Sequence, residues 1–456
     1  MFVNAYPWLF PGGIGDINDG ERGQVKSIRE WANHLIHYYD GRFQSDQLFT
    51  LYVFNTIQRH DNNKNGGYFF TDKNWLGKNP PSLEELKDQI RNGEFKFVSK
   101  LRYFTQQIRG SDAFWRSKTN ELESWIDFHV SRHHGPPTHF ITLTCAENWW
   151  PDLRNIMYDL EVASEKGNVN EHAKKLKNND FSALRKSVAK YPLYVNQYFM
   201  KRANEFMDGY ARDVLGIEYY WGRVEFAAGR GQIHLHILGI AKNKAYLHKF
   251  YRAETEQDKT DVMEKYATRM LDLTADTQVD ENHDKLDQNT KEITSPLGIR
   301  FGECTDEDRD HRLLAQDCMY HDCNDYCLGE VKKTRQDGQD ICRKCRFGFG
   351  TEKHAGERDT EGKGLHEKAK IVKDHKGVEH FYMPRRYSER INQHSRSLLQ
   401  AWRANADVQL LIYRSDPNLP DVGEIESVCR YVVAYAGKRY KTCRQEINMI
   451  QDVILG

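Results

Sequence analysis

A regular alternation of apolar and polar positions marks GRGQIHLHILGI, residues 229–240. Successive side chains of a β-strand point to opposite faces, so every second residue shares a face. The apolar residues of IHLHI would therefore form one face, which is typical of a protein core. The opposite face would carry His234 and His236, with both imidazoles projecting in the same direction.

The preceding stretch, GIEYYWGRVEF at residues 216–226, also has a strand-like pattern and is followed by the turn-forming AAGRGQ. Two such strands joined by a Gly-rich connection predict an antiparallel β-hairpin. In RVEF, Arg223 and Glu225 fall on one face, and the apolar residues beside them fall on the other. Glu225 can therefore lie across the turn on the histidine face.

Other segments predict further strands and helices. Strands are expected in HFITLTC (139–145) and ADVQLLIYR (406–414), and helices at 191–216 and at 426–454, the second with a bend at Gly437. The first 110 residues are expected to form a compact and mostly helical unit. Within it, Ser82 is followed three residues later by Glu85, which is the pattern of a helix-capping box.

The net charge of the chain is zero, with 66 Lys and Arg against 66 Asp and Glu. Balanced charge alone disfavours a nucleic-acid binder. Residues 252–330 carry a net charge of −12, however, so the remainder carries +12 and the objection weakens. The weakly patterned stretch 252–316 is expected to form an acidic surface excursion.

No apolar run in the sequence approaches the roughly 20 residues that a membrane helix needs. The opening residues MFVNAYPWLFPGG also lack the basic leader of a signal peptide. The sequence therefore indicates neither a membrane span nor secretion.

His234, His236 and Glu225 together form a candidate three-point site for a divalent ion. Two neutral imidazoles and one carboxylate leave coordination positions open for phosphate oxygens and water. Imidazole ligands suit Mn²⁺, whereas Mg²⁺ prefers oxygen ligands. The alternative is that both histidines are ordinary strand residues. Whether Glu225 reaches the ion depends on the turn geometry.

RYVVAYAGKRYK, residues 430–441, carries a second candidate cluster. Tyr431 and Tyr435 are four residues apart, so on a helix they would project from one face, with Lys438 one turn further along. A tyrosine oxygen beside a metal-bound phosphate is a plausible nucleophile, and Lys438 could help to hold the phosphate. The alternative is an aromatic packing stripe.

The nine cysteines of the chain favour metal binding or free thiols over disulfides. Two closely spaced pairs lie within residues 317–350, and their spacing predicts a structural zinc site. The expected ligands are Cys323, Cys327, Cys342 and Cys345, with Cys318 and His321 as rival ligands. Zinc would fold a segment that is too small and too charged to build its own core. The alternative is free thiols in a flexible insert.

Several other residues are weaker candidates. YMPRRYSERINQHSR (382–396) mixes basic and aromatic residues, as grooves for single-stranded nucleic acid do. The candidate phosphate contacts are Arg385, Arg386 and Arg390, together with Arg439 beside the tyrosine motif. HVSRHHGPPTH (129–139) is expected to be a solvated loop. Trp149 and Trp150 would either pack in the core or stack on bases.

These motifs together resemble a known family. HLH matches the His-hydrophobic-His signature of HUH endonucleases, and FITLTC resembles the strand that precedes it in rolling-circle Rep proteins. The tyrosine pair with Lys438 resembles the two-tyrosine motif of Helitron transposases. YPWLFPGGIGD, EWANHLIHYYDGRFQSDQLFTLYVFN, GGYF, ITLTCAENWWPDL and INQHSRSLLQAWRANADVQLL resemble Helitron blocks in the same order.

The resemblance implies an α+β fold: an HUH nuclease core with a central antiparallel sheet flanked by helices. It further implies a Helitron-like N-terminal domain at 1–110 and an endonuclease domain at 111–456, interrupted by an acidic and Cys-rich insert at 252–384. Similar Cys/His blocks occur at this place in Helitron proteins. By analogy, a tyrosine cleaves single-stranded DNA, keeps the 5′ phosphate and frees a 3′ hydroxyl, with Mg²⁺ or Mn²⁺ as cofactor.

The resemblance also implies single-stranded DNA partners, namely the transposon end and the target, and a nuclear location. The chain ends without a P-loop G-x-x-x-x-G-K-[ST], so the helicase of the family is expected C-terminal to it in the full-length protein. Two rival functions remain open. One is a plasmid- or virus-type rolling-circle Rep initiator, and the other is a non-catalytic DNA-binding module derived from a transposase.

Overall fold

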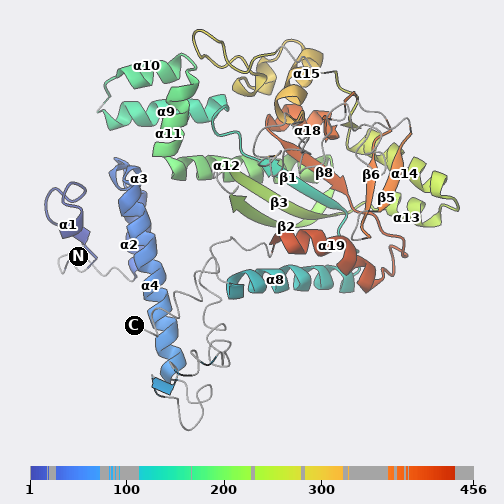
Figure 1. Ribbon diagram of the computed structural model, residues 1–456, viewed down its shortest axis with the longest axis horizontal. Coiled ribbons are helices and arrows are strands. Elements are labelled where there is room, and N and C mark those ends of the chain that lie inside the picture. Colours follow the sequence, from blue (N-terminus) through green and yellow to red (C-terminus); the bar gives the residue numbers. More distant parts are fainter. Residues whose placement is uncertain are drawn as a thin grey trace, which may run out of the picture. The chain divides into compact units, whose positions relative to one another are not determined.

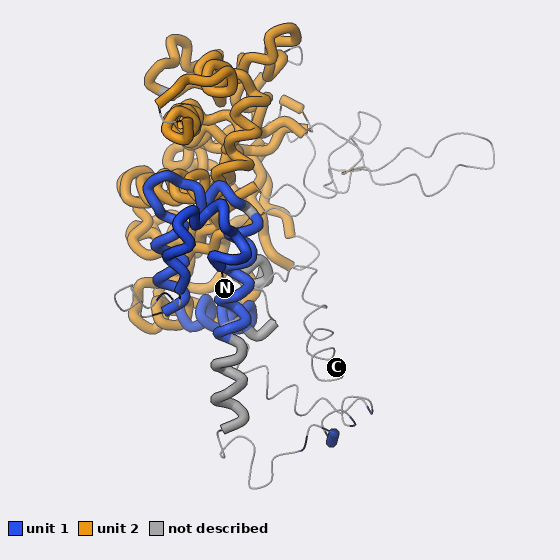
Figure 2. Tube along the Cα trace, turned by 90° about the vertical axis from the view of Figure 1, so that its left-hand side faces the viewer, with its two compact units in different colours: residues 1–125, 433–456 blue, residues 126–432 orange. Residues whose placement is uncertain are grey.

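The chain forms two compact units in the computed structural model. Unit 1 comprises residues 1–125 and 433–456, and unit 2 comprises residues 126–432 (Figure 2). The structure describes residues 2–17, 19, 27–71, 82, 84–85, 88, 92, 112–165, 167–226, 232–278, 283–321, 327, 368–373, 377–384, 387–388 and 390–436.

The described part of unit 1 is helical and has an aromatic core. Its helices are α1 (Phe2–Ala5), α2 (Ile28–Ile36), α3 (Arg42–Ser45) and α4 (Gln47–Thr71). The ring of Phe2 lies 4.6 Å from Trp31 and 6.3 Å from Phe49, between centroids. These three rings are almost fully buried, so the helices are held together mainly by apolar contact.

Two helix starts in unit 1 are stabilised by side-chain caps. The hydroxyl of Ser27 accepts the backbone N–H of Glu30 at the start of α2. The predicted capping box is confirmed, because the N–H of Ser82 donates to Glu85 at 2.7 Å and the N–H of Glu85 donates to Ser82 at 3.2 Å. Each cap satisfies backbone donors that have no partner within the helix.

Unit 2 is built around a four-stranded antiparallel sheet (Figure 1). The strand order is β2-β3-β1-β8, and the strands are β1 (His139–Thr144), β2 (Ile217–Phe226), β3 (Ile233–Ala241) and β8 (Ala406–Leu410). The predicted hairpin is confirmed as β2 and β3, and both further predicted strands are present. β3 and β1 are the two central strands.

The register of the sheet separates an apolar face from a polar face. Ile141 pairs with Ile237 on one side and with Val408 on the other, and all three side chains are buried. Arg223 pairs with His236, and Glu225 pairs with His234. Because directly paired residues share a face, the prediction that Glu225 lies on the histidine face is confirmed.

Helices surround this sheet in unit 2 (Figure 1). They are α8 (Asp112–Ser131, which starts in unit 1), α9 (Pro151–Ser164), α10 (Glu171–Lys177), α11 (Phe181–Lys190), α12 (Pro192–Phe206), α13 (Ala245–Arg252), α14 (Glu256–Met270), α15 (Glu307–Cys318), α18 (Arg396–Trp402) and α19 (Val422–Ala436, which ends in unit 1). The helix predicted at 191–216 is confirmed as α12, which continues into a π-helical turn, η2 (Met207–Ala211).

Short elements complete the unit. Two-stranded sheets pair β4 (Leu273–Thr274) with β7 (His394–Ser395) and β5 (Lys370–Lys373) with β6 (Glu379–Tyr382). Two 3₁₀ turns are η3 (Pro296–Gly298) and η4 (Phe301–Glu303).

The acidic stretch at 252–316 is not the unpatterned excursion that its composition predicted. It contains α14, where Met263 and Ala267 are fully buried, and most of α15, where Leu314 is fully buried. The hydroxyl of Thr255 caps α14 by accepting the N–H of Asp258. A few apolar residues at helical spacing are enough to define a buried face, even where most residues between them are charged.

The prediction of a solvated loop at 129–139 is also wrong at both of its ends. His129 lies in α8 and is 5% exposed, and its ring packs at a tilt against Tyr219, with centroids 4.6 Å apart. His139 begins β1 and is fully buried, and burial lowers its pKa to about 4. Aromatic contacts with β2 and pairing in the sheet therefore outweigh the polarity of this stretch.

A buried ion pair joins the region after β3 to the segment that precedes β8. The guanidinium of Arg403 contacts both carboxylate oxygens of Asp310, at 2.8 and 3.1 Å, and its Nε donates to the carbonyl of Pro296 at 3.0 Å. Arg403 and Asp310 are 2% and 4% exposed. The bidentate geometry offsets the cost of taking both charges out of water.

We predict that Asp310→Asn lowers the free energy of unfolding by about 3–5 kcal/mol, because it leaves a buried guanidinium without a compensating charge. Urea unfolding followed by Trp fluorescence measures the change. The matched control is Asp308→Asn, which breaks the exposed ion pair with Arg396 and should change little. Equal urea midpoints for Asp310→Asn and the parent protein would contradict the structural role of the pair.

Candidate functional site

His236 lies at the centre of the polar face of the sheet, on β3 between β1 and β2. Its Nε2 is 3.2 Å from Glu225 Oε2, and its Nδ1 is 3.1 Å from the hydroxyl of Thr142. The ring also stacks on Phe140, with centroids 5.9 Å apart. Contacts from both neighbouring strands therefore fix the orientation of this imidazole.

His234 lies two residues earlier on the same face, in register with Glu225 on β2 and with Thr144 on β1. Its Nδ1 is 3.0 Å from the backbone carbonyl of Gln232. A carbonyl only accepts hydrogen bonds, so Nδ1 carries the hydrogen and Nε2 of the neutral ring carries the lone pair. This is the arrangement by which proteins prepare a histidine to bind a metal through Nε2.

Asp407 on β8 extends the polar row, and sequence analysis did not single it out. Thr142 pairs with Asp407 on one side and with His236 on the other, so all three share a face. Burial raises the pKa of Asp407 to about 6, although Gln409 donates a hydrogen bond to it at 2.6 Å. The sequence feature that could have identified Asp407 is its place as an acidic residue among alternating positions of the strand predicted at 406–414.

The donor types on this face are those of a divalent-metal site, but the described residues do not form a closed site. No three His, Cys, Asp or Glu side chains within the described ranges are arranged to hold one ion. His236 and Glu225 are in direct contact, and His234 is the cross-strand neighbour of Glu225. Two imidazole nitrogens and a carboxylate oxygen suit Mn²⁺ better than Mg²⁺, which prefers oxygen ligands.

Tyr431 and Tyr435 both lie on α19, so the predicted helix is confirmed as far as Ala436. The structure describes the backbone at these two positions. Helical spacing puts residues four apart on one side of the helix. Lys438, Arg439 and the predicted bend at Gly437 lie outside the described residues.

The first half of α19 is anchored in unit 2. The carboxylate of Glu424 accepts the backbone N–H groups of Arg414 and Ser415, the second at 2.9 Å. One turn later, Cys429 is fully buried and its sulfur lies 3.7 Å from the Tyr413 hydroxyl. The backbone that leads into Tyr431 is therefore fixed to the segment that follows β8.

Most of the predicted zinc ligands and DNA contacts lie outside the described residues, namely Cys323, Cys342, Cys345, Arg385 and Arg386. Cys327 is described and buried. Burial raises the pKa of the rival ligand Cys318, at the end of α15, to about 12. The backbone N–H of His321 donates to the carbonyl of Arg390 at 2.9 Å.

The tryptophan pair belongs to the fold of unit 2. Trp150 is 1% exposed, and its Nε1 donates to the carbonyl of Arg403 at 2.9 Å. Trp149 is partly buried and packs at a tilt against Phe181, with ring centroids 4.7 Å apart. Of the two alternatives for Trp150, packing in the core is therefore confirmed.

Comparison with known proteins gave one family match. Residues 31–239 match the family model described as "Helitron helicase-like domain at N-terminus". The match includes His234 and His236 and ends before the insert and the tyrosine helix. A search of curated proteins found no match. None of the described helices combines the length and the apolar character that crossing a lipid bilayer requires.

We predict that Asp407→Asn makes unit 2 more stable at neutral pH. The folded pKa of about 6 is above the ordinary value of 3.8, so between these values the folded state binds more protons than the unfolded state. The contribution of Asp407 to stability therefore falls as pH rises from about 4 to 6. The difference between variant and parent should grow over this range to at most about 3 kcal/mol at pH 7.

Urea unfolding at pH 4, 5, 6 and 7 in the presence of EDTA measures this difference. Subtracting the free energy of unfolding of the parent protein at each pH removes the contribution of other titrating groups, including buried histidines. A constant difference across the four pH values would show that Asp407 keeps an ordinary pKa in the folded protein.

Proposed function

Because this chain is a Helitron-related protein, we propose that it is a metal-dependent endonuclease and strand transferase for single-stranded DNA. In this proposal unit 2 is an HUH nuclease core that acts in rolling-circle-type transposition. The observation that carries the proposal is the contact of His236 with Glu225 beside the cross-strand pair of His234 and Glu225. The match to the Helitron-like domain supports it independently.

The residues of the polar face would hold Mg²⁺ or Mn²⁺ and the scissile phosphate together. His234 and His236 would bind the ion through Nε2, and Glu225 would be the third ligand. A divalent ion bound there supplies a positive charge that stabilises negative charge on the phosphate. Thr142 keeps the His236 ring in place, and the carbonyl of Gln232 does the same for His234.

The nucleophile in the proposal is the hydroxyl of Tyr431 or Tyr435. Its oxygen attacks the phosphorus and loses its proton to solvent, while the bond from phosphorus to the 3′ oxygen breaks. The 3′ oxygen takes up a proton and leaves as a hydroxyl, and the 5′ phosphate stays on the tyrosine as a diester. A second 3′ hydroxyl reverses the step and joins two strands. Two tyrosines allow cleavage and joining to alternate, and Lys438 would hold the phosphate.

The remaining parts of the proposal concern stability and DNA contacts. Zn²⁺ would be held by Cys323, Cys327, Cys342 and Cys345, with Cys318 and His321 as alternatives, and would fold the Cys-rich segment. Arg385, Arg386, Arg390 and Arg439 would contact the phosphates of the transposon end and the target. A C-terminal helicase in the full-length protein and a nuclear location complete the proposal.

We predict that the protein forms a covalent adduct with single-stranded DNA in the presence of Mn²⁺. Labelled DNA that stays on the protein in a denaturing gel measures it. Tyr431→Phe with Tyr435→Phe should abolish the adduct, because both nucleophilic oxygens are lost. The control Tyr251→Phe alters an exposed tyrosine on α13 and should still form the adduct. No adduct with any divalent metal would favour a non-catalytic DNA-binding module.

We further predict that His234→Ala or His236→Ala lowers nicking at least 100-fold but changes DNA affinity by less than about threefold. Affinity should come mainly from phosphate contacts and should fall steeply as salt rises. Nicking of a labelled strand and anisotropy titrations measure the two effects. His248→Ala on α13 is the matched control. Unimpaired nicking by both site variants would refute the metal assignment.

A further inference from the structure

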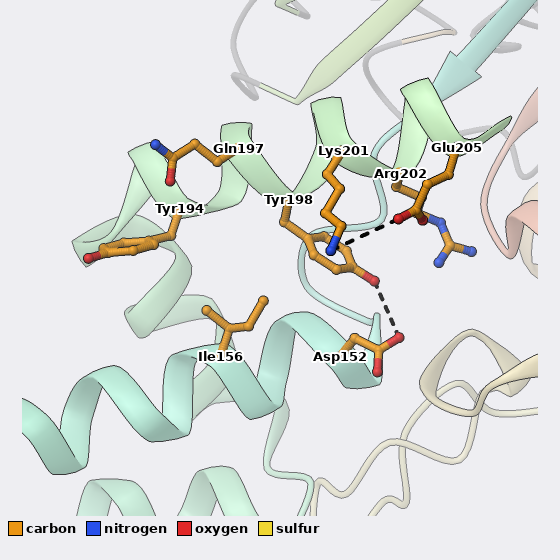
Figure 3. Close-up of a pocket in the computed structure, with 8 residues that line it drawn as sticks. All are labelled: Asp152, Ile156, Tyr194, Gln197, Tyr198, Lys201, Arg202 and Glu205. Carbon is orange, nitrogen blue, oxygen red and sulfur yellow. Dashed lines mark hydrogen bonds and ion pairs between the residues drawn. The ribbon is translucent and has the colours of Figure 1, made fainter. Parts of the chain in front are cut away.

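A cavity of about 460 Å³ lies between α9 and α12 in unit 2 (Figure 3). Its volume is in the range of about 300–1,000 Å³ that is typical of small-molecule sites. The lining residues are Asp152 and Ile156 from α9, and Tyr194, Gln197, Tyr198, Lys201, Arg202 and Glu205 from α12. None of these residues belongs to the proposed catalytic site.

Two tyrosine rings and an isoleucine side chain line the apolar part of this cavity. Tyr194 and Tyr198 are four residues apart on α12 and therefore project from the same side of the helix. In Figure 3 the Tyr198 ring is directed toward Asp152 at the start of α9, the Tyr194 ring extends to the side away from Tyr198, and Ile156 rises from α9 between them. The hydroxyl of Tyr198 donates to Asp152 at 3.4 Å, which orients its ring.

The polar groups that line the cavity are the carboxylates of Asp152 and Glu205, the amine of Lys201, the guanidinium of Arg202 and the amide of Gln197. Lys201 and Glu205 project from successive turns of α12, and Lys201 Nζ lies 4.0 Å from Glu205 Oε1. Asp152 is held by Arg300, whose Nε donates to it at 2.7 Å. The two carboxylates can accept hydrogen bonds from amino groups of a ligand. The chemistry is that of a flat aromatic ligand with exocyclic N–H donors.

Arg202 fixes the wall of the cavity and links it to the histidine row. Its guanidinium lies over the rings of Trp150 and Trp402, at 4.7 and 5.2 Å, and donates to the carbonyl of Trp402 at 2.8 Å. Trp402 Nε1 in turn donates to the carbonyl of Thr144 at 2.9 Å. Thr144 is the register partner of His234.

We propose that this cavity binds one unpaired nucleobase of the single-stranded DNA, stacked on the ring of Tyr194, with Tyr198 and Ile156 as the neighbouring wall. The inference rests on the proposed function, because that function supplies the strand. Stacking on aromatic side chains is the general way in which proteins hold splayed single-strand bases. The carboxylate of Glu205 would accept from an exocyclic amino group, so cytosine, adenine or guanine is favoured over thymine, which has none. Lys201 would neutralise the adjoining phosphate.

The test is a scan of single-stranded oligonucleotides that carry 2-aminopurine at successive positions, bound to the full chain. At one position the fluorescence should be quenched by stacking. Tyr194→Leu, which removes the ring but keeps an apolar side chain, should relieve the quenching, and Tyr194→Phe should keep it. The control Tyr251→Leu changes a residue on α13 and should keep the quenching as well. The same quenching profile in the parent, Tyr194→Leu and Tyr198→Leu would overturn the proposal.

A second measurement leaves the protein unchanged, so it does not depend on how the variants fold. An abasic nucleotide at the quenched position should weaken binding by about 5- to 150-fold, the range that corresponds to the loss of one stacked base. Thymine there should bind more weakly than cytosine. Equal affinity for the abasic and the intact strand would refute the proposal.

The covalent-adduct assay on the same preparations separates the two proposals. If the adduct forms but no quenching depends on Tyr194, the base site is refuted and the nuclease proposal is retained. Quenching that depends on Tyr194, with no adduct under any divalent metal, supports the base site and refutes the nuclease.

Discussion

The antiparallel register of β3 between β1 and β2 is the constraint on which the rest of unit 2 depends. Side chains alternate along each strand, so one register decides the face of every residue in the sheet. With Thr142 opposite His236 and Glu225 opposite His234, the polar groups of separate strands meet on one face. The apolar residues simultaneously meet on the other face, where helices can cover them. A slip of one residue would bury the imidazoles and expose the core.

The second constraint is the way in which distant segments are tied to this sheet. The Arg403–Asp310 pair joins α15 to the segment just before β8, and Trp402 donates to the end of β1. These contacts position β8 and therefore Asp407 beside Thr142. They also hold Arg202 and the wall of the α9–α12 cavity, so the polar row and the cavity share one set of supporting residues.

Sequence patterns predicted the local features well. The hairpin, its faces and the capping box at Ser82 follow from periods of two residues or from neighbours within one turn. Features that depend on distant residues were not predictable in this way. The raised pKa of Asp407 comes from burial in the folded sheet, and His129 is buried by Tyr219, 90 positions away in the sequence. The helices of the acidic stretch were missed because average composition hides a few well-spaced apolar residues.

The position of β8 has a consequence for how the chain acquires its structure during synthesis. β8 pairs with β1 although 164 residues separate the end of β3 from its start, at Ala241 and Ala406. On the ribosome, the β2–β3 hairpin can therefore form and pair with β1 long before the fourth strand emerges. Until then the outer edge of β1 offers open backbone hydrogen-bonding groups. Such late, non-local closure is slow and leaves the nascent chain exposed to aggregation until β8 has emerged.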